Sequence, residues 1–188
     1  MLDIWSASCY NNGMKLKKAI QFATKAHEGQ VRKYTGEPYI VHPLEVVEIV
    51  KTVEHTEEML MAAVLHDTVE DTDTTIQDID REFGPVVAQL VSELTDVSKP
   101  EDGNRATRKG IDRDHLSQAS AQGQTIKIAD LISNTGSITE HDPKFAKIYM
   151  KEKALLLQVL DKADKILLKK AQKVLDIWSA SCYNTGIK

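Results

Sequence analysis

Apolar residues recur every three or four positions along most of the chain, which is the period of an amphipathic α-helix. Between residues 15 and 27, for example, Leu16, Ile20 and Ala23 follow this spacing, and Gly29 comes shortly afterwards as a stop signal. The same spacing and its capping residues predict further helices over 43–50, 57–69, 75–83, 85–97, 104–121, 125–138 and 142–178. The segments 30–41 and 98–103 contain Pro and Gly and are predicted loops. No stretch alternates with a period of two, so we predict an all-α fold, a single-domain helical bundle.

One decapeptide, LDIWSASCYN, occurs twice, at residues 2–11 and again at 175–184. Identity over ten residues is not a chance event, but two copies at opposite ends do not make a solenoid. We interpret the copies as terminal segments outside the functional unit, with a role in pairing two chains as the alternative. The predicted division is an N-terminal segment 1–14, a central domain 15–160 and a C-terminal helix extension 161–188. The Leu and Ile positions of that last helix leave a homodimer open, although folding back on the core is the commoner use.

Composition limits the classes of partner. The 188 residues carry 24 Lys and Arg against 28 Asp and Glu, a net charge of −4, which gives no basic face for DNA or RNA. A small anionic ligand stays compatible, because a pocket needs only a few placed cations. No apolar run is long enough for a membrane span and no signal peptide begins the sequence. Two cysteines do not form a disulfide framework, and we expect a cytoplasmic protein.

The densest chemistry lies in residues 65–71, LHDTVED. On a helix, His66 and Glu70 are four residues apart, as are Asp67 and Asp71, so two pairs stack on neighbouring stripes. Three carboxylates and an imidazole in two turns repel one another unless a cation intervenes. The mixture of nitrogen and oxygen donors suits Mn²⁺, Fe²⁺ or Zn²⁺. The alternative is a solvated acidic helix end with Lys or Arg nearby.

Two further residues fit such a centre. His42 stands just before Pro43 at a predicted loop-to-helix junction, where its imidazole can point away from its own helix. Asp130 is the only acid in the mostly apolar segment IKIADLISN, and an unpaired carboxylate is costly to bury there. A salt bridge with Lys127, or an exposed stripe, are the alternatives for Asp130.

Together, YIVHP, LHDTVED and IKIADLISN resemble the HD-domain metal phosphohydrolases, and within them the alarmone-hydrolase branch, over residues 15–160. The resemblance implies an HD-type helical bundle with one divalent metal, usually Mn²⁺. It assigns the metal ligands to His42, His66, Asp67 and Asp130, and the handling of the attacking water to Glu70 and Asp71. It also implies substrate contacts by Arg32, Lys33, Asn134 and Ser137.

The sequence departs from that branch at several places. Leu131 and Ser133 stand where a basic residue and a His or Tyr are common, and Tyr34 extends the basic segment to RKYTG, where it could stack on a base. None of these differences falls on a predicted metal ligand. The base of the nucleotide can be guanine or adenine. On the polar helix, Arg108 and Lys109 are further candidates for neutralising phosphoryl charge, with a solvated basic face as the alternative.

The expected activity is hydrolysis of the 3′-pyrophosphate of a purine alarmone, (p)ppGpp or (p)ppApp, with release of pyrophosphate. A metal lowers the pKa of bound water, to about 7 for strong Lewis acids, and a carboxylate can accept its proton. Two alternatives stay open: an HD nucleotidase or phosphodiesterase acting on another nucleotide, and a non-catalytic nucleotide-binding protein. Intact Glu70 and Asp71 argue against the second of these.

Overall fold

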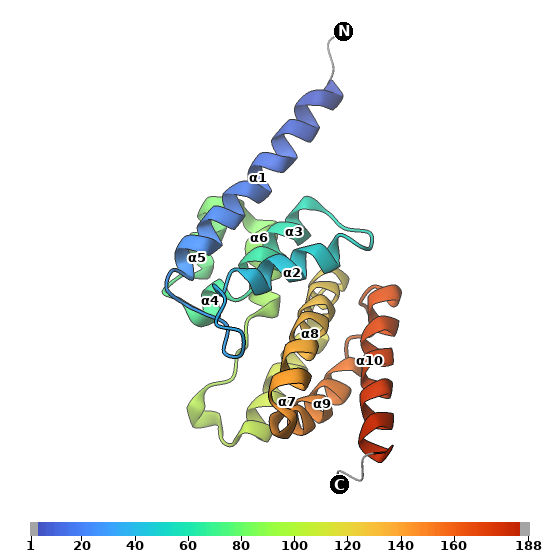
Figure 1. Ribbon diagram of the computed structural model, residues 1–188. Helices are drawn as coiled ribbons and strands as arrows, with labels where there is room; N and C mark the ends of the chain where they lie inside the picture. The colour runs from blue at the N-terminus through green and yellow to red at the C-terminus, as the bar shows by residue number, and fades with distance from the viewer. Residues whose placement is uncertain (1–3, 185–188) are drawn as a thin grey trace. The chain divides into compact units, whose positions relative to one another are not determined.

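The computed structural model describes the backbone of residues 4–184 and the side chains of residues 13–180 (Figure 1). Within these residues the regular structure is helical, apart from one isolated β-bridge between Val31 and Pro38. The predicted all-α fold is therefore confirmed. The chain forms two compact units, Met1–Thr95 and Asp96–Lys188, which are described separately.

The first unit is built around one short helix that is apolar on all sides after its first two residues. Its helices are α1 (Ile4–Ala26), α2 (Val41–Val50), α3 (Glu57–Leu65), α4 (Thr68–Asp71), α5 (Ile76–Phe83) and α6 (Pro85–Leu94). Every residue of α3 from Met59 to Leu65 is buried, and α1, α2 and α6 all pack against it (Figure 1). A helix that is apolar on all sides has to be central, because it has no face suited to water. This core fixes the two ends of α3, and the candidate site lies at the C-terminal one.

The helix predicted over 57–69 is wrong in its second half. The α3 helix ends at Leu65, His66 and Asp67 form a turn, and the single turn α4 follows. Side chains form hydrogen bonds with carbonyl groups at the end of α3. The Thr68 hydroxyl donates to Leu65 O over 2.7 Å, and His66 Nδ1 lies 2.8 Å from Ala63 O. Such bonds compete with the helical backbone ladder. The break leaves the Asp67–Asp71 spacing helical, since Asp71 N donates to Asp67 O over 2.9 Å.

The second unit packs around a long central helix. It contains a short 3₁₀ turn η1 (Pro100–Asp102), α7 (Arg105–Gln118), α8 (Ala121–His141), α9 (Pro143–Leu157) and α10 (Lys165–Asn184). The α8 helix contacts both α9 and α10, and its Ile126, Ile128 and Ala129 are fully buried. It begins at Ala121, before the predicted residue 125, because the Ser120 hydroxyl caps it by accepting from Gly123 N.

A single helix over 142–178 is also wrong, because residues 158–164 separate α9 from α10. The backbone N–H groups of Lys162 and Asp164 donate to the side chains of Gln124 and Thr125 on α8, both over 2.9 Å. The Asp164 carboxylate then caps α10 by accepting from Ile166 N and Leu167 N. Apolar periodicity runs through this break, since Leu160 and Ala163 are buried within it, so the pattern alone could not locate it.

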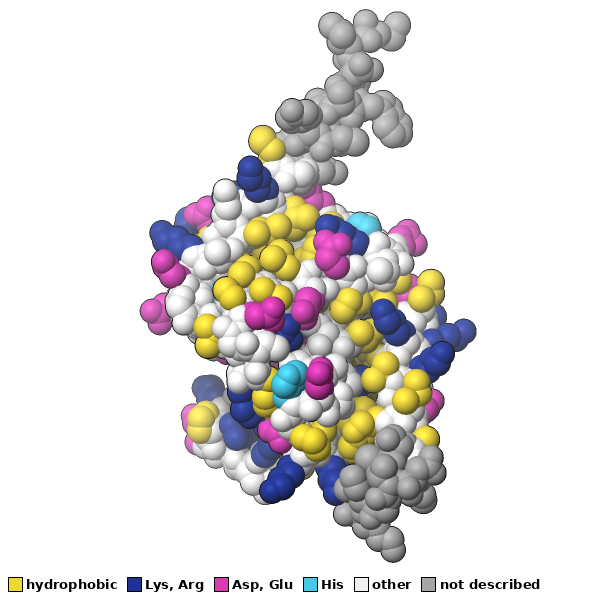
Figure 2. All heavy atoms as spheres, in the orientation of Figure 1, with side chains coloured by type: hydrophobic (Ala, Val, Ile, Leu, Met, Phe, Trp, Pro, Cys, Tyr) yellow, Lys and Arg dark blue, Asp and Glu magenta, His cyan; other side chains and the backbone are white. Residues whose placement is uncertain are grey.

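The two copies of the decapeptide are helical where the structure describes them, at the start of α1 and the end of α10. Their predicted role falls mostly on side chains outside the described residues, those of 1–12 and 181–188. On the face shown in Figure 2, the Lys and Arg side chains are interspersed with acidic and apolar ones. Among the described residues, no helix is both long and apolar enough to cross a membrane.

Candidate functional site

Two imidazoles and a carboxylate meet at the C-terminal end of α3. His42, His66 and Asp67 each offer one ligand atom, and these atoms all lie within 4.8 Å of one another. His42 comes from the first turn of α2, and its ring centroid lies 5.4 Å from that of His66. Both histidines are only 3% exposed, so they are held in place by packing. The structure thus brings together three of the four predicted ligands.

The donor atoms of this cluster are arranged as a cation would require. His66 Nδ1 faces a carbonyl oxygen, which only accepts, so Nδ1 carries a proton and Nε2 is the ring nitrogen that can bind a metal ion. That Nε2 lies 3.2 Å from Asp67 Oδ1, and His42 Nε2 lies 3.6 Å from Asp67 Oδ2. The lone pairs of a ring nitrogen and of a carboxylate oxygen repel each other unless a proton or a metal ion lies between them. The cluster fits a divalent metal, with the nitrogen and oxygen donors that transition metals accept.

Tyr39 orients the shared carboxylate, and its role was not predicted. Its hydroxyl donates to Asp67 Oδ2 over 2.6 Å, and its ring packs 4.7 Å from the buried ring of His27. Hydrogen bonds to metal-ligating groups hold those groups in one orientation. The signal was present in YIVHP, where Tyr39 precedes His42 by three residues. His27 is itself buried, with Nδ1 2.8 Å from Gln30 Oε1.

The two predicted catalytic acids lie in α4, directly after the cluster. Desolvation raises the pKa of Asp71, the Asp67 carboxylate adds to the rise, and a hydrogen bond from Tyr39 opposes it. A raised pKa makes a carboxylate a better proton acceptor near neutral pH. Gln30 Nε2 donates to Asp71 O over 2.8 Å and so ties the end of α4 to the loop before α2. Glu70 is exposed.

The predicted basic segment lies in the loop between α1 and α2. Arg32 is largely buried and Nη1 donates to Glu45 Oε1 over 2.9 Å, while the Lys33 ammonium lies 4.7 Å from the Tyr34 ring centroid. The Tyr34 ring, which could stack on a nucleotide base, therefore already has the Lys33 ammonium over it. Substrate contacts by these three residues stay a prediction.

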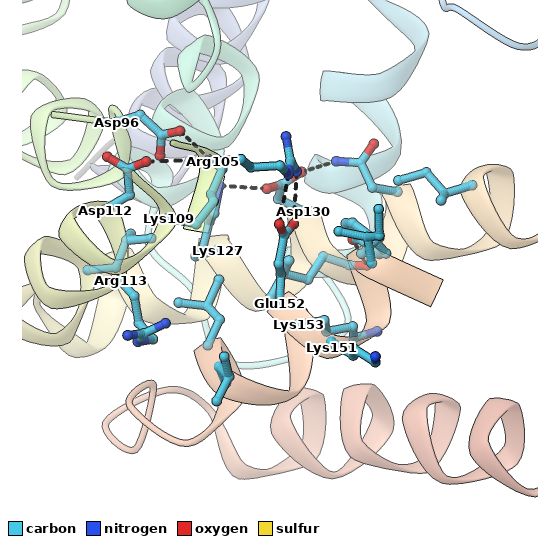
Figure 3. A pocket seen from close by; sticks show the side chains of 18 of the residues that line it. Asp96, Arg105, Lys109, Asp112, Arg113, Lys127, Asp130, Lys151, Glu152 and Lys153 are labelled. Atoms are coloured by element: carbon cyan, nitrogen blue, oxygen red, sulfur yellow. Dashed lines mark hydrogen bonds and ion pairs between the residues drawn. The ribbon is translucent and has the colours of Figure 1, made fainter. Parts of the chain in front are cut away.

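The second unit contains a cavity of about 650 Å³ between α7, α8 and α9 (Figure 3). Asp130 and Asn134, one turn apart on α8, both line it, and Asn134 Nδ2 donates to Asp130 Oδ1 over 2.6 Å. Lys127 Nζ lies 2.9 Å from Asp130 Oδ2, so the ion pair weighed as an alternative is present. Because Asp130 belongs to the second unit, its membership of the metal site stays a prediction.

The cations of α7 differ in where they lie. Lys109 lines the cavity and pairs with Asp96 over 2.6 Å, and Arg105 lines it with two bonds to Glu152, of 2.7 and 2.8 Å. Arg108 and Ser137 are not among the residues that line the cavity. The residues that line the cavity therefore give no support to the predicted substrate contacts of Arg108 and Ser137.

The sequence model of the HD domain matches residues 19–180, which include the cluster and the cavity. This chain belongs to the HD domain family.

Named relatives of this HD domain fall into two groups by length. The guanosine-3′,5′-bis(diphosphate) 3′-pyrophosphohydrolase MESH1 of Drosophila melanogaster is 36% identical over 132 residues, 69% of this chain and 72% of its own length. A solved structure described as a metazoan ortholog of SpoT that hydrolyses ppGpp superposes with a TM-score of 0.77 at 29% identity. The match covers 94% of the chain in that structure and 86% of this chain.

Other relatives are much longer than this HD domain. The GTP pyrophosphokinase of Streptomyces coelicolor is 38% identical over 121 residues, 64% of this chain, but the match spans only 14% of its length.

Replacing Tyr39 by Phe tests the orientation of Asp67. The change removes one hydrogen bond to a carboxylate, so we expect the affinity of the HD domain for Mn²⁺ to fall about tenfold. Isothermal titration with Mn²⁺ measures this. Tyr34→Phe is the matched control, because its hydroxyl is 3.2 Å from Lys33 Nζ, a cation outside the cluster. Equal affinities in both variants would show that Tyr39 does not hold Asp67 for the metal.

Proposed function

We propose that this chain hydrolyses the 3′-pyrophosphate of a purine alarmone, (p)ppGpp or (p)ppApp, and releases pyrophosphate. The observation that carries the proposal is the His42–His66–Asp67 cluster with Asp71 one helical turn away. The names of the relatives support the substrate class, since MESH1 and the ortholog of SpoT both act on guanosine 3′-pyrophosphates. The match covers 72% of MESH1 but only 14% of the GTP pyrophosphokinase, which carries most of its length outside the match.

We assign the metal site to His42, His66 and Asp67, with Asp130 as the fourth ligand and Mn²⁺ as the ion. When bound, such an ion polarises a phosphoryl oxygen and lowers the pKa of a water ligand. Imidazole nitrogens and a carboxylate oxygen form a mixed donor set of the kind that divalent transition-metal ions accept.

The remaining residues have roles set by their chemistry. Asp71, whose pKa is raised, accepts the proton of the attacking water, and Glu70 acts beside it as an acceptor through a second water. Asn134 binds the substrate from α8 while it orients Asp130. Lys109, with Arg32 and Lys33 from the first unit, neutralises phosphate charge as the bond to the leaving group breaks.

The nucleotide base is the least constrained part of the substrate. Tyr34 offers a flat ring that can stack on any purine, and stacking does not distinguish guanine from adenine. We therefore propose the class of purine 3′-pyrophosphates. We also propose that the protein acts in the cytoplasm and that it forms a homodimer. The helix α10 packs against α8 and α9 of its own chain, so it is not assigned to the contact between two copies.

A panel of nucleotides tests the function. Purified protein with Mn²⁺ is incubated with ppGpp, pppGpp, ppApp and simple 5′-nucleotides, and pyrophosphate and phosphate are measured separately. We expect pyrophosphate from at least one 3′-pyrophosphorylated nucleotide and no product after chelation. Phosphate from 5′-mononucleotides alone would identify a nucleotidase instead. Tight binding without turnover would identify a nucleotide-binding protein.

A further inference from the structure

A lysine is buried in the wall of the cavity in the second unit. Lys153, on α9, is only 1% exposed and is among the largest fully buried side chains of the described residues (Figure 3). Its Nζ donates to the Thr135 hydroxyl on α8 over 2.8 Å. That hydroxyl in turn donates to Leu131 O, so its proton is already used and it serves Lys153 as an acceptor. Two elements of the cavity wall thus hold one ammonium group in place.

Among the described residues, no carboxylate is paired with this charge. Burial lowers the pKa of Lys153 to about 8, and desolvation is the one cause of that shift. An ammonium has three N–H donors, and within the part of the chain that the structure describes one of them has a partner. Buried charges are normally paired, because leaving one unpaired costs free energy. Lys153 therefore has two donors and a positive charge to offer a ligand.

Three of the five other cations around the cavity differ in this respect, and the remaining two, Arg113 and Lys151, are not buried. Arg105 is bound to Glu152, Lys109 to Asp96 and Lys127 to Asp130, all at 2.9 Å or less. An anion that enters the cavity has to compete with a carboxylate for each of these three. Lys153 presents no such competition, and apolar side chains such as Leu131, Ile148 and Leu156 line the same cavity and reduce the screening by water.

We propose that Lys153, which Thr135 holds in place, forms an anion subsite for a phosphate group of the nucleotide, separate from the Asp130–Asn134 pair. Thr135 follows that pair along α8, and Asp130 does not contribute to the pKa of Lys153. If the 3′-pyrophosphate is handled at Asp130, the group left for Lys153 is the 5′-phosphate. This assignment of the 5′ end rests on the proposed function, whereas the anion subsite itself rests on the cavity and its lysine.

Binding of a product analogue in the absence of metal tests the subsite. GDP and guanosine are titrated calorimetrically into wild-type protein, Lys153→Met and Lys151→Met. Met matches the length of the lysine stem and removes a buried charge, so the variant is expected to fold, which circular dichroism checks. Lys151 lines the same cavity from the same helix but is exposed, which makes it the matched control.

We expect Lys153→Met to weaken GDP binding about tenfold to a hundredfold, the range for a lost hydrogen bond to a charged group, and to leave guanosine binding unchanged. Lys151→Met should stay within about twofold of wild type, as is usual for exposed charges. In wild-type protein at pH 8.5, GDP binding should also take up protons, because an anion beside the ammonium raises its pKa. Calorimetry in two buffers of different ionisation enthalpy measures this uptake, which Lys153→Met should lose.

Equal GDP affinity in wild type and Lys153→Met, or no binding of GDP by the wild type, would overturn the subsite. Hydrolysis of ppGpp with pyrophosphate release would leave the proposed function standing in either case. Conversely, lysine-dependent GDP binding without any pyrophosphate release would retain the subsite and remove the function.

Discussion

Replacement of Asp67 by Asn should abolish both metal binding and hydrolysis. Asn has nearly the same shape, so the turn at residues 66–67 is preserved, but its side chain is neutral. Both imidazole Nε2 atoms of the cluster face the Asp67 carboxylate, so this one charge is shared between two ligands. Its loss removes the anionic donor that neutralises the cation, and we expect the rate to fall by at least about a thousandfold, equivalent to roughly 4 kcal/mol.

Two measurements separate this effect from unfolding. Metal content after gel filtration in Mn²⁺ reports the site directly, and initial rates with ppGpp report catalysis. Asp73→Asn is the matched control, because Asp73 is an exposed acid close by in the sequence and outside the cluster. An Asp67→Asn protein that retains its metal and turns over at the wild-type rate would remove Asp67 from the centre.

Much of this cluster could be anticipated, because its chemistry is local in sequence. His66 and Asp67 are adjacent, and His42 is marked by Pro43 at the start of α2. Tyr39 was missed because a tyrosine before a buried histidine also fits an ordinary core position. Its role depends on a 2.6 Å contact to Asp67, which is 28 residues away in the chain, and no spacing rule reports such a contact.

The helix breaks could not be predicted, because they depend on side chains that replace backbone bonds. At Leu65 the side chains that replace backbone bonds are those of Thr68 and His66. The break turns His66 and Asp67 toward one centre. At residues 158–164 they come from Gln124 and Thr125 on α8, far away in sequence. Burial continues across both breaks, through His66 and Thr68 in the first and through Leu160 and Ala163 in the second. A pattern of burial therefore carries no information about which backbone groups are bonded.

The geometry within the second unit is compatible with two roles for Asp130. It pairs with Lys127 over 2.9 Å and accepts from Asn134 over 2.6 Å, which is sufficient for a buried structural carboxylate. The same contacts suit a ligand that supporting groups hold in orientation. The two interpretations differ in what Lys127 does, because in the second it competes with the metal for the carboxylate.

Matched variants of this ion pair should therefore change metal affinity in opposite directions. Asp130→Asn removes an anionic ligand, and we expect Mn²⁺ affinity to fall about tenfold to a hundredfold, as for loss of a liganding or supporting group. Lys127→Met leaves the carboxylate in place and removes its competitor, so the affinity for Mn²⁺ should rise. Titration of both proteins with Mn²⁺ measures this, with circular dichroism to show that they fold. If Asp130 serves the fold alone, the affinity of both variants equals that of wild type, and the three-ligand cluster of the first unit has to bind its metal without Asp130.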